Sequence, residues 1–257
     1  MAKGFFITAT GTGVGKTVVA GALIRLLKDK GLKVAAMKPV ESGCRKIESA
    51  VSHGGQSGGG VFFVPADGVF LREMAEMEES VHEVVPYCFE APLAPMAAAE
   101  IERVRIDIKK IISRFERLSA GYDAVIVEGI GGLLVPIKRD QPSGRTGGYY
   151  VLDLALELGL PLVIVASLSL GTINHTLLTV RCALGAGAEV AGVIVNHGGN
   201  QLGHAEGLAE KTNPRIIREL SPVPVIGELP FLHDISAGVI GDAAQKNIDF
   251  SLLKRFL

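Results

Sequence analysis

The sequence predicts an α/β protein with a doubly wound, mostly parallel sheet, and three observations carry this prediction. Short apolar runs alternate with helix-like runs along the chain of 257 residues. The apolar runs are continuous and lack a polar alternation, which is typical of strands covered on both faces of a parallel sheet. No linker long enough to divide the chain is visible, so we expect a single domain over residues 1–257.

The expected elements follow one another in a regular order. The candidate strands are Gly4–Thr8, Lys33–Lys38, Asp123–Val127, Leu160–Ala166, Val190–Val195 and Val223–Gly227. The candidate helices are Lys16–Lys30, Arg105–Ser119, Ile173–Gly185 and Glu206–Glu219. In Arg105–Ser119 apolar side chains recur at helical spacing, so one face of that helix should cover the sheet. Two polar stretches, Gly43–Gly68 and Lys138–Gly148, are expected to be irregular loops, either at the ligand-binding edge of the sheet or as plain exposed insertions.

Composition and charge exclude several classes of protein. The 26 basic and 27 acidic residues leave a net charge of −1, so no electrostatic signal indicates binding to nucleic acid or to an anionic membrane. The apolar runs are shorter than the about 20 residues that span a bilayer. The three cysteines, Cys44, Cys88 and Cys182, are far apart and odd in number, which indicates free thiols in a reducing compartment. A glycine-rich loop stands where a signal peptide would need its cleavage site, so we expect a cytoplasmic protein.

A glycine-rich loop follows the first candidate strand and leads into the first candidate helix. Residues 9–17 read ATGTGVGKT, in which glycines let backbone N–H groups converge on phosphate oxygens at a helix N-terminus. We interpret the segment as the phosphate-binding loop of a P-loop NTPase-like fold, although Thr10 stands where the usual pattern has glycine. A glycine-rich turn of structural origin is the alternative. The residues expected to bind ATP in this loop are Gly13, Val14, Gly15, Lys16 and Thr17.

Two more charged residues end strands at the same edge of the predicted sheet. Lys38 ends the second candidate strand, and Glu128 follows the third. Because the carboxyl ends of parallel strands face one crevice, both side chains should approach Lys16. Two lysines on one triphosphate indicate phosphoryl transfer, so we assign catalytic roles to Lys38 and Lys16, and expect Glu128 and Thr17 to bind Mg²⁺. The residues after this carboxylate that should approach the nucleotide are Gly129, Ile130 and Gly131.

Six motifs in one order give the sequence a specific resemblance. They are TGTGVGKT at 10–17, KPVESG at 38–43, VEGIGG at 127–132, LGTINHTLLT at 170–179, GVIVN at 192–196 and GELPFL at 227–232. Each motif alone is a weak to moderate signal, whereas six in order are a strong one. On these motifs the chain resembles the dethiobiotin synthetase family.

The resemblance implies an ATP- and Mg²⁺-dependent cyclo-ligase of biotin biosynthesis. In such an enzyme one amine of 7,8-diaminononanoate captures CO₂ as a carbamate, ATP phosphorylates the carbamate, and the second amine closes the ureido ring of dethiobiotin. This chemistry asks for positioning and charge neutralisation more than for a protein nucleophile. The resemblance also implies a homodimer with substrate sites near the interface.

The resemblance further implies a role for particular residues. Lys38 becomes the catalytic lysine and Ser42 a substrate contact. The metal ligands become Thr17, Glu128 and a loop aspartate, for which Asp67 is the best candidate; its alternative role is a helix N-cap. The substrate carboxylate would meet a helix N-terminus formed by Gly171, Thr172, Ile173 and Asn174, the last of which is alternatively a simple cap. The adenine would meet Asn196, His197, Pro230, Phe231 and Leu232.

Two other interpretations of the phosphate loop stay open. A cobyrinate-type synthetase begins with a similar loop but carries an added glutamine-hydrolysing domain, for which 257 residues leave no room. A partition-type ATPase switch carries a lysine where this chain has Gly11, and no amphipathic membrane-binding tail is evident. Arg139 and Arg145, in the second polar stretch, are expected either to cover the phosphates or to lie in solvent.

Overall fold

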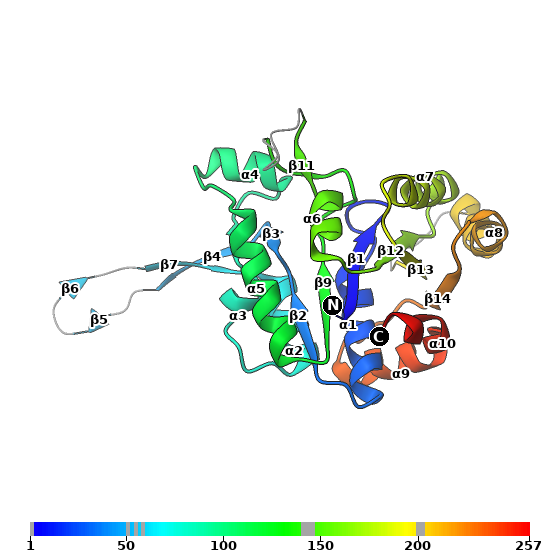
Figure 1. Ribbon diagram of the computed structural model, residues 1–257, viewed down its shortest axis with the longest axis horizontal. Helices are drawn as coiled ribbons and strands as arrows, with labels where there is room; N and C mark the ends of the chain where they lie inside the picture. Colours follow the sequence, from blue (N-terminus) through cyan, green and yellow to red (C-terminus); the bar gives the residue numbers. More distant parts are fainter. Residues whose placement is uncertain (1–2, 50–51, 54–55, 58–59, 140–146, 199–203) are drawn as a thin grey trace.

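A six-stranded parallel sheet forms the centre of the protein in the computed structural model (Figure 1), which describes residues 3–49, 52–53, 56–57, 60–139, 147–198 and 204–257. The strands lie in the order β14, β13, β12, β1, β9, β2, and all neighbours are parallel. Their bounds are β1 Gly4–Ala9, β2 Val34–Met37, β9 Ala124–Glu128, β12 Leu162–Ser167, β13 Val190–Asn196 and β14 Val225–Leu229. The predicted α/β class with a mostly parallel sheet is confirmed.

Helices cover both faces of this sheet. Their bounds are α1 Lys16–Asp29, α2 Ala66–Ala75, α3 Val81–Val84, α4 Pro95–Ile101, α5 Ile108–Gly121, α6 Val151–Leu158, α7 Thr172–Gly185, α8 His204–Leu220, α9 Ala237–Asn247, α10 Phe250–Leu253 and the 3₁₀ turn Lys254–Phe256. Right-handed crossovers place α1, which packs against α2 and α9, on one face. They place α5, α6, α7 and α8 on the other, where α5 contacts α6 and α7 contacts α8. None of the described helices has the length and apolar character needed to cross a bilayer.

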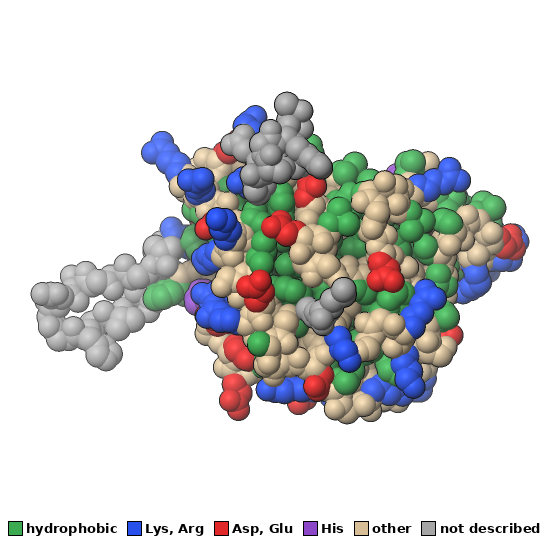
Figure 2. Space-filling model, in the orientation of Figure 1, with side chains coloured by type: hydrophobic (Ala, Val, Ile, Leu, Met, Phe, Trp, Pro, Cys, Tyr) green, Lys and Arg blue, Asp and Glu red, His purple; other side chains and the backbone are tan. Residues whose placement is uncertain are grey.

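The elements expected from the sequence are present, with some additions. All six candidate strands occur with ends shifted by one or two residues, and the four candidate helices occur as α1, α5, α7 and α8. The added helices α2, α4, α6 and α9 are short, between 7 and 11 residues. Figure 2 shows basic and acidic side chains interspersed over one face of the molecule, in agreement with the net charge of −1.

The expectation of an irregular loop over Gly43–Gly68 is wrong for much of the described part of that segment. β4 (Arg45–Ser49) pairs with β7 (Gly60–Val64) in an antiparallel hairpin, and β5 (Ser52–His53) pairs with β6 (Gln56–Ser57). Together they form an arm that extends away from the sheet (Figure 1). Ile47 and Phe62 face each other across the hairpin and are both exposed, so no buried face imposes the alternation by which such strands are recognised.

The second polar stretch is only partly described. β10 (Pro136–Lys138), where this stretch begins, pairs with β11 (Tyr149–Tyr150), which directly follows it. Arg139 is exposed and forms an ion pair with Glu100 at 2.7 Å. Residues 140–146, which include Arg145, lie outside the described residues.

The carboxyl ends of three neighbouring strands, β1, β9 and β2, lie at one edge of the sheet. β1 lies between β12 and β9, and Ile7 is paired with Glu128. β9 is in turn paired with β2, where Val127 faces Met37, the residue before Lys38. After β2, the short strand β3 (Val40–Ser42) pairs with β8 (Tyr87–Phe89) beside the same edge. The strand order therefore places the phosphate loop, Lys38 and Glu128 together.

Candidate active site

The loop between β1 and α1 has the backbone conformation of a phosphate-binding loop. Gly13 and Gly15 have φ angles of 75° and 88°, which residues with side chains rarely adopt. Gly15 is the N-cap of α1, so the first N–H groups of that helix have no acceptor within the helix and are free to bind a ligand at the loop. A Cβ at Gly15 would lie 2.1 Å from Nδ2 of Asn196, and that amide donates to the Val14 carbonyl at 3.0 Å. Asn196, at the end of β13, therefore braces the loop.

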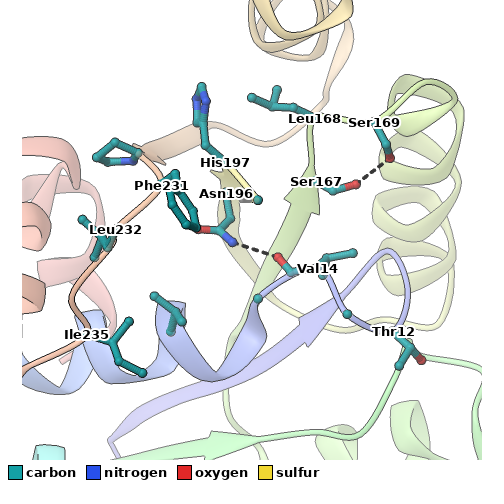
Figure 3. A pocket seen from close by; sticks show the side chains of 15 residues that line it. Thr12, Val14, Ser167, Leu168, Ser169, Asn196, His197, Phe231, Leu232 and Ile235 are labelled. Atoms are coloured by element: carbon teal, nitrogen blue, oxygen red, sulfur yellow. Dashed lines mark hydrogen bonds between the residues drawn. The ribbon is translucent and has the colours of Figure 1, made fainter. Parts of the chain in front are cut away.

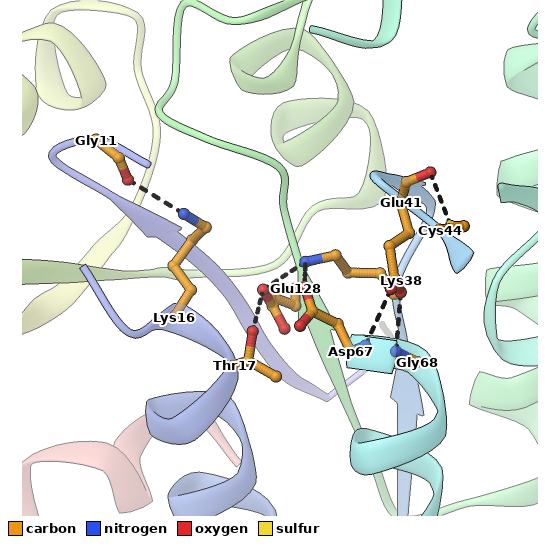
Figure 4. A network of polar contacts seen from close by, with 9 residues as sticks. All are labelled: Gly11, Lys16, Thr17, Lys38, Glu41, Cys44, Asp67, Gly68 and Glu128. Carbon is orange, nitrogen blue, oxygen red and sulfur yellow. Dashed lines mark hydrogen bonds and ion pairs between the residues drawn. The ribbon is translucent and has the colours of Figure 1, made fainter. Parts of the chain in front are cut away.

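Four side chains from different elements converge beside this loop (Figure 4). Lys38 follows β2, Glu128 ends β9, Thr17 lies in α1 and Asp67 lies in α2. Nζ of Lys38 donates to Oε1 of Glu128 at 2.5 Å and to Oδ2 of Asp67 at 2.9 Å. Oγ1 of Thr17 donates to the same Glu128 oxygen at 3.1 Å. The fold thus brings together four of the residues singled out from the sequence.

The ion pair between Lys38 and Glu128 is buried. The two side chains are 3% and 1% exposed. Burial by itself would lower the pKa of Lys38, but the adjacent carboxylates of Glu128 and Asp67 outweigh it and hold this pKa above its usual range. Lys38 therefore keeps its proton at neutral pH and supplies a fixed positive charge.

Lys16 is a second buried cation at the same edge. Its Nζ donates to the carbonyl of Gly11 at 3.2 Å, at the other end of the loop. Burial lowers the pKa of Lys16 to about 8, an effect that the nearby Glu128 only partly offsets. A bound triphosphate would favour the charged ammonium, because opposite charges a few ångströms apart stabilise the ionised form.

One oxygen of Glu128 shows that the donor set fits a divalent cation. Oε2 is buried and has no hydrogen-bond partner among the described residues, which is costly for a carboxylate. The hydroxyl of Thr17 and the carboxylate of Asp67 add the oxygen donors that Mg²⁺ prefers. The described residues hold no cluster of three or more His, Cys, Asp or Glu suited to a metal. Two carboxylates and a hydroxyl are the kind of protein ligand set found for an ion that takes its other ligands from phosphate and water.

A cavity of about 330 Å³ opens over this network, and we call it the reaction cavity. It contains both lysines, both carboxylates and Ser42, the residue expected to contact substrate. The other lining residues include the phosphate loop and one further acid, Glu41. Its full lining is Thr12, Gly13, Gly15, Lys16, Thr17, Lys38, Glu41, Ser42, Asp67, Glu128, Ile130 and Gly131.

A second cavity of about 480 Å³ lies on the other side of the phosphate loop (Figure 3), and we call it the base cavity. It shares Thr12, Gly13 and Gly15 with the reaction cavity. All five residues expected to contact adenine line it: Asn196, His197, Pro230, Phe231 and Leu232. Nε2 of His197 lies 2.9 Å from Oε1 of Glu228.

Some expected site residues lie elsewhere. Gly129 lines neither cavity; it is buried against Phe6, and a Cβ there would come within 2.8 Å of that ring. The segment Gly171–Asn174 forms the start of α7 as expected but lines neither cavity. Thr172 is buried and donates to the carbonyl of Ser167 at 2.5 Å, while Asn174 is exposed.

The sequence did not single out several residues that line these cavities. In the base cavity they are Thr12, Val18, Ser167, Leu168, Ser169, Gly198 and Ile235. Ser167 ends β12 at the carboxyl edge, and this position is the signal that could have identified it. In the reaction cavity the missed residues are Thr12, which also lines the base cavity, and Glu41, which lies inside the motif KPVESG but has no signal of its own.

Comparisons with known proteins agree with this geometry. Residues 3–238 match a family model described as an AAA domain. The chain is 41% identical over 253 residues to the ATP-dependent dethiobiotin synthetase BioD of Thermodesulfovibrio yellowstonii, covering 98% of this chain and 99% of that protein. It is 35% identical over 251 residues to the protein of the same name from Bacillus subtilis, covering 98% and 97%. The MinC:MinD cell division protein complex of Aquifex aeolicus is similar with a TM-score of 0.51 and 14% identity, covering 99% of this chain and 95% of that chain, and this likeness shows the P-loop NTPase-like fold alone.

Proposed function

The chain belongs to the family of ATP-dependent dethiobiotin synthetases, and on that premise we propose that it forms dethiobiotin from 7,8-diaminononanoate and CO₂ at the expense of ATP. The observation that carries the assignment of residues is the convergence of Lys38, Glu128, Asp67 and Thr17 beside the phosphate loop. The two adjoining cavities support it, because one is charged and the other is lined largely by apolar groups.

ATP would lie across the phosphate loop with its two ends in different cavities. The triphosphate meets the loop amides and the ammonium of Lys16. The adenine enters the base cavity, where Phe231 and Leu232 offer apolar surface and Asn196 offers its amide oxygen. The γ-phosphate then points toward Lys38, which places the transferred group in the reaction cavity.

The first chemical step is carbamate formation in the reaction cavity. One amine of the substrate attacks the carbon of CO₂, a C–N bond forms, and the nitrogen releases a proton. The product carries a negative charge next to a triphosphate, so a fixed positive charge is needed. The buried ammonium of Lys38 supplies it, and Ser42 is positioned to contact the substrate from the same cavity wall.

Phosphoryl transfer and ring closure follow from the same arrangement. A carbamate oxygen attacks the γ-phosphorus, the bond to ADP breaks, and a mixed anhydride forms. The second amine then attacks the carbamate carbon, inorganic phosphate leaves, and the ureido ring closes. Lys16 and Lys38 together balance the charge spread over the transferred phosphoryl group. No protein nucleophile is required, which fits a cavity that holds two lysines and three carboxylates.

We assign the magnesium ion that accompanies ATP to Thr17, Asp67 and Glu128. Bound there, the ion would add positive charge beside the β- and γ-phosphates. The unpaired Oε2 of Glu128 supports the assignment, since a cation would compensate its burial.

We also propose that two copies of the chain form a homodimer through the surface around α7. Leu170, just before α7, and Leu178, within it, are 79% and 59% exposed, so apolar side chains are exposed around this helix start. They flank Gly171–Asn174, which lies outside both cavities of its own protomer. A twofold contact there would let this helix start reach the substrate carboxylate bound by the partner. Leu178→Asp should give a monomer in sedimentation analysis that still binds ATP but no longer makes dethiobiotin.

We further propose a cytoplasmic location and a single domain. Cys44, Cys88 and Cys182 are free thiols, which supports a reducing compartment such as the cytoplasm. A core cluster that runs from β1 to α10 supports a single ligase domain over residues 1–257. The proposed ligands are small molecules, with no nucleic acid and no membrane among them.

The reaction is tested with purified protein, MgATP, bicarbonate and 7,8-diaminononanoate. We expect phosphate release that depends on the diamine and is matched by dethiobiotin. Lys38→Met should abolish both, whereas Lys109→Met, at an exposed position of α5, should change neither. Phosphate release without a need for the diamine would overturn the ligase assignment. Full turnover by Lys38→Met would overturn the role of that lysine and leave the ligase assignment standing.

A further inference from the structure

Glu41 is a buried carboxylate in the reaction cavity that the proposed chemistry does not use. It lies in β3, three residues after Lys38, and is 5% exposed. Its Oε1 accepts from the backbone N–H of Asp67 at 3.0 Å, and its Oε2 accepts from that of Gly68 at 2.9 Å. Both oxygens therefore accept hydrogen bonds from the first turn of α2 (Figure 4).

α2 begins without a cap of its own. Its N-cap residue is Pro65, which makes no side-chain hydrogen bond to the first turn. The free N–H groups of a helix start need an acceptor, and a negative charge there is favourable. Glu41 supplies both from a distant part of the chain. A Cβ at Gly68 would lie 2.1 Å from Cγ2 of Val85, so the helix start also fits closely against its surroundings.

The path of the chain explains why such a link is needed. After Ser42 the chain leaves the sheet along β4, and it returns along β7 just before α2, so the arm separates Ser42 from Asp67. Covalent connection through the arm does not fix the position of Asp67 relative to Lys38. α2 packs against α1 and β2, and its first turn is tied to the surroundings of Lys38 by the ion pair of Lys38 with Asp67 and by the two backbone hydrogen bonds that Glu41 accepts.

We propose that Glu41 is a positioning residue, which holds the start of α2 so that the carboxylate of Asp67 meets the metal ion and Lys38. The inference rests on the proposed role of Asp67 as a metal ligand. Glu41 touches neither the metal nor the nucleotide and acts through Asp67. Glutamine cannot replace it, because a carboxamide has one acceptor oxygen for two N–H groups and turns a donor toward the second.

The test measures metal binding directly. Mn²⁺ is titrated by electron paramagnetic resonance into protein loaded with a non-hydrolysable ATP analogue, and thermal unfolding is recorded for each variant. Asp67→Ala should weaken Mn²⁺ binding, and Glu41→Ala and Glu41→Gln should each weaken it about tenfold, as loss of a group that orients a ligand does. The double variant Glu41→Ala, Asp67→Ala should bind Mn²⁺ no more weakly than Asp67→Ala alone.

Asp107→Ala provides the matched control. Asp107 caps α5 by accepting from the N–H of Lys109 at 3.0 Å, outside both cavities, so its loss should lower thermal stability and leave Mn²⁺ affinity unchanged. Unchanged Mn²⁺ affinity in Glu41→Ala, alongside weaker binding in Asp67→Ala, would show that Glu41 is merely a helix cap and overturn the inference. An effect of Glu41→Ala that persists in the Asp67→Ala background would overturn it as well. Unchanged affinity in Asp67→Ala would overturn the metal role of Asp67 and, with it, the inference.

Discussion

The two cavities that meet at the phosphate loop are lined by different kinds of side chain. In the reaction cavity the working groups are charged and buried: Lys16, Lys38 and Glu128 are 7%, 3% and 1% exposed. In the base cavity Phe231 and Ile235 are 47% and 48% exposed, and neutral side chains make up most of the wall. The working groups of the reaction cavity are thus buried and paired by charge, whereas the wall of the base cavity is largely apolar.

This difference separates two functions that a reaction of ATP requires, which are stabilisation of the transition state and binding of the nucleotide. Buried charges of fixed position stabilise a transition state, because they need no reorganisation when charge develops. Exposed apolar surface contributes affinity that is equal in the ground state and the transition state. Substitutions in the reaction cavity should therefore lower kcat, and substitutions in the base cavity should raise the KM for ATP.

Removing Lys38 should have the largest effect. Lys38→Met leaves Glu128 buried without its partner, which costs about 3–5 kcal/mol of unfolding free energy. Turnover should fall by about a thousandfold, since a charge that stabilises the transition state is lost. Urea denaturation and phosphate release measure the two effects.

A second variant separates stability from catalysis. Lys38→Met combined with Glu128→Met replaces the ion pair by apolar groups, which is often neutral for stability. The double variant should regain most of the unfolding free energy and none of the turnover. Recovered turnover in the double variant would show that the reaction cavity does not work through these charges.

Asn196 lines the base cavity and braces the phosphate loop, which both cavities share. Its replacement therefore tests whether the residue acts in ATP binding or in turnover. Asn196→Ala removes the hydrogen bond to Val14 and leaves that carbonyl without its donor, which costs about 1–3 kcal/mol. The KM for ATP should rise about tenfold with kcat nearly unchanged. The matched control is Asn247→Ala in α9, where the amide donates to the carbonyl of Ala243 at 2.8 Å away from both cavities. A fall in kcat with unchanged KM would place Asn196 in the reaction cavity instead.

Phe231 tests the base cavity alone. Its ring forms a T-shaped pair with His233, with centroids 4.8 Å apart, and lines the base cavity. Phe231→Ala should raise the KM for ATP about fivefold, which corresponds to about 1 kcal/mol of lost contact. Phe62→Ala, an equally exposed ring on the arm, should leave KM and kcat at their original values. Equal effects of the two substitutions would argue against adenine binding at Phe231.

Much of the fold was predictable, and the exceptions have physical reasons. A strand buried on both faces is apolar throughout, so the runs around Phe6 and Ile164 can be recognised as strands from the sequence. The short helix α4 is rich in alanine, and α9 is rich in alanine and glycine, so their sequences offer few large apolar side chains that would mark a helical face. In the arm the paired side chains of Ile47 and Phe62 are both exposed, so these strands lack the pattern that a core would impose.

The site was predictable where residues end strands, and less so where it depends on distant partners. Lys16, Lys38 and Glu128 follow strands at the carboxyl edge, and the structure places all three around one cavity. Asp67 was reached through the family pattern, and the structure puts it 2.9 Å from Lys38. Glu41 had no signal, because its importance depends on a helix start that lies beyond the arm.

The smallest effect should come from pH, and it tests whether the charge of Lys16 contributes to phosphate binding. Burial lowers the pKa of this lysine from 10.5 to about 8, so in the free protein it loses its proton near that pH. Phosphate favours the charged form, so binding above pH 8 must take up a proton and becomes weaker as pH rises. Between pH 7.5 and 8.5 the affinity for ADP in the presence of a metal chelator should fall about threefold. Isothermal titration in two buffers of different ionisation enthalpy should show the proton uptake. Lys16→Met should bind ADP more weakly with no pH dependence in this range, and a flat profile in the unaltered protein would mean that Lys16 is already fully charged before the nucleotide arrives.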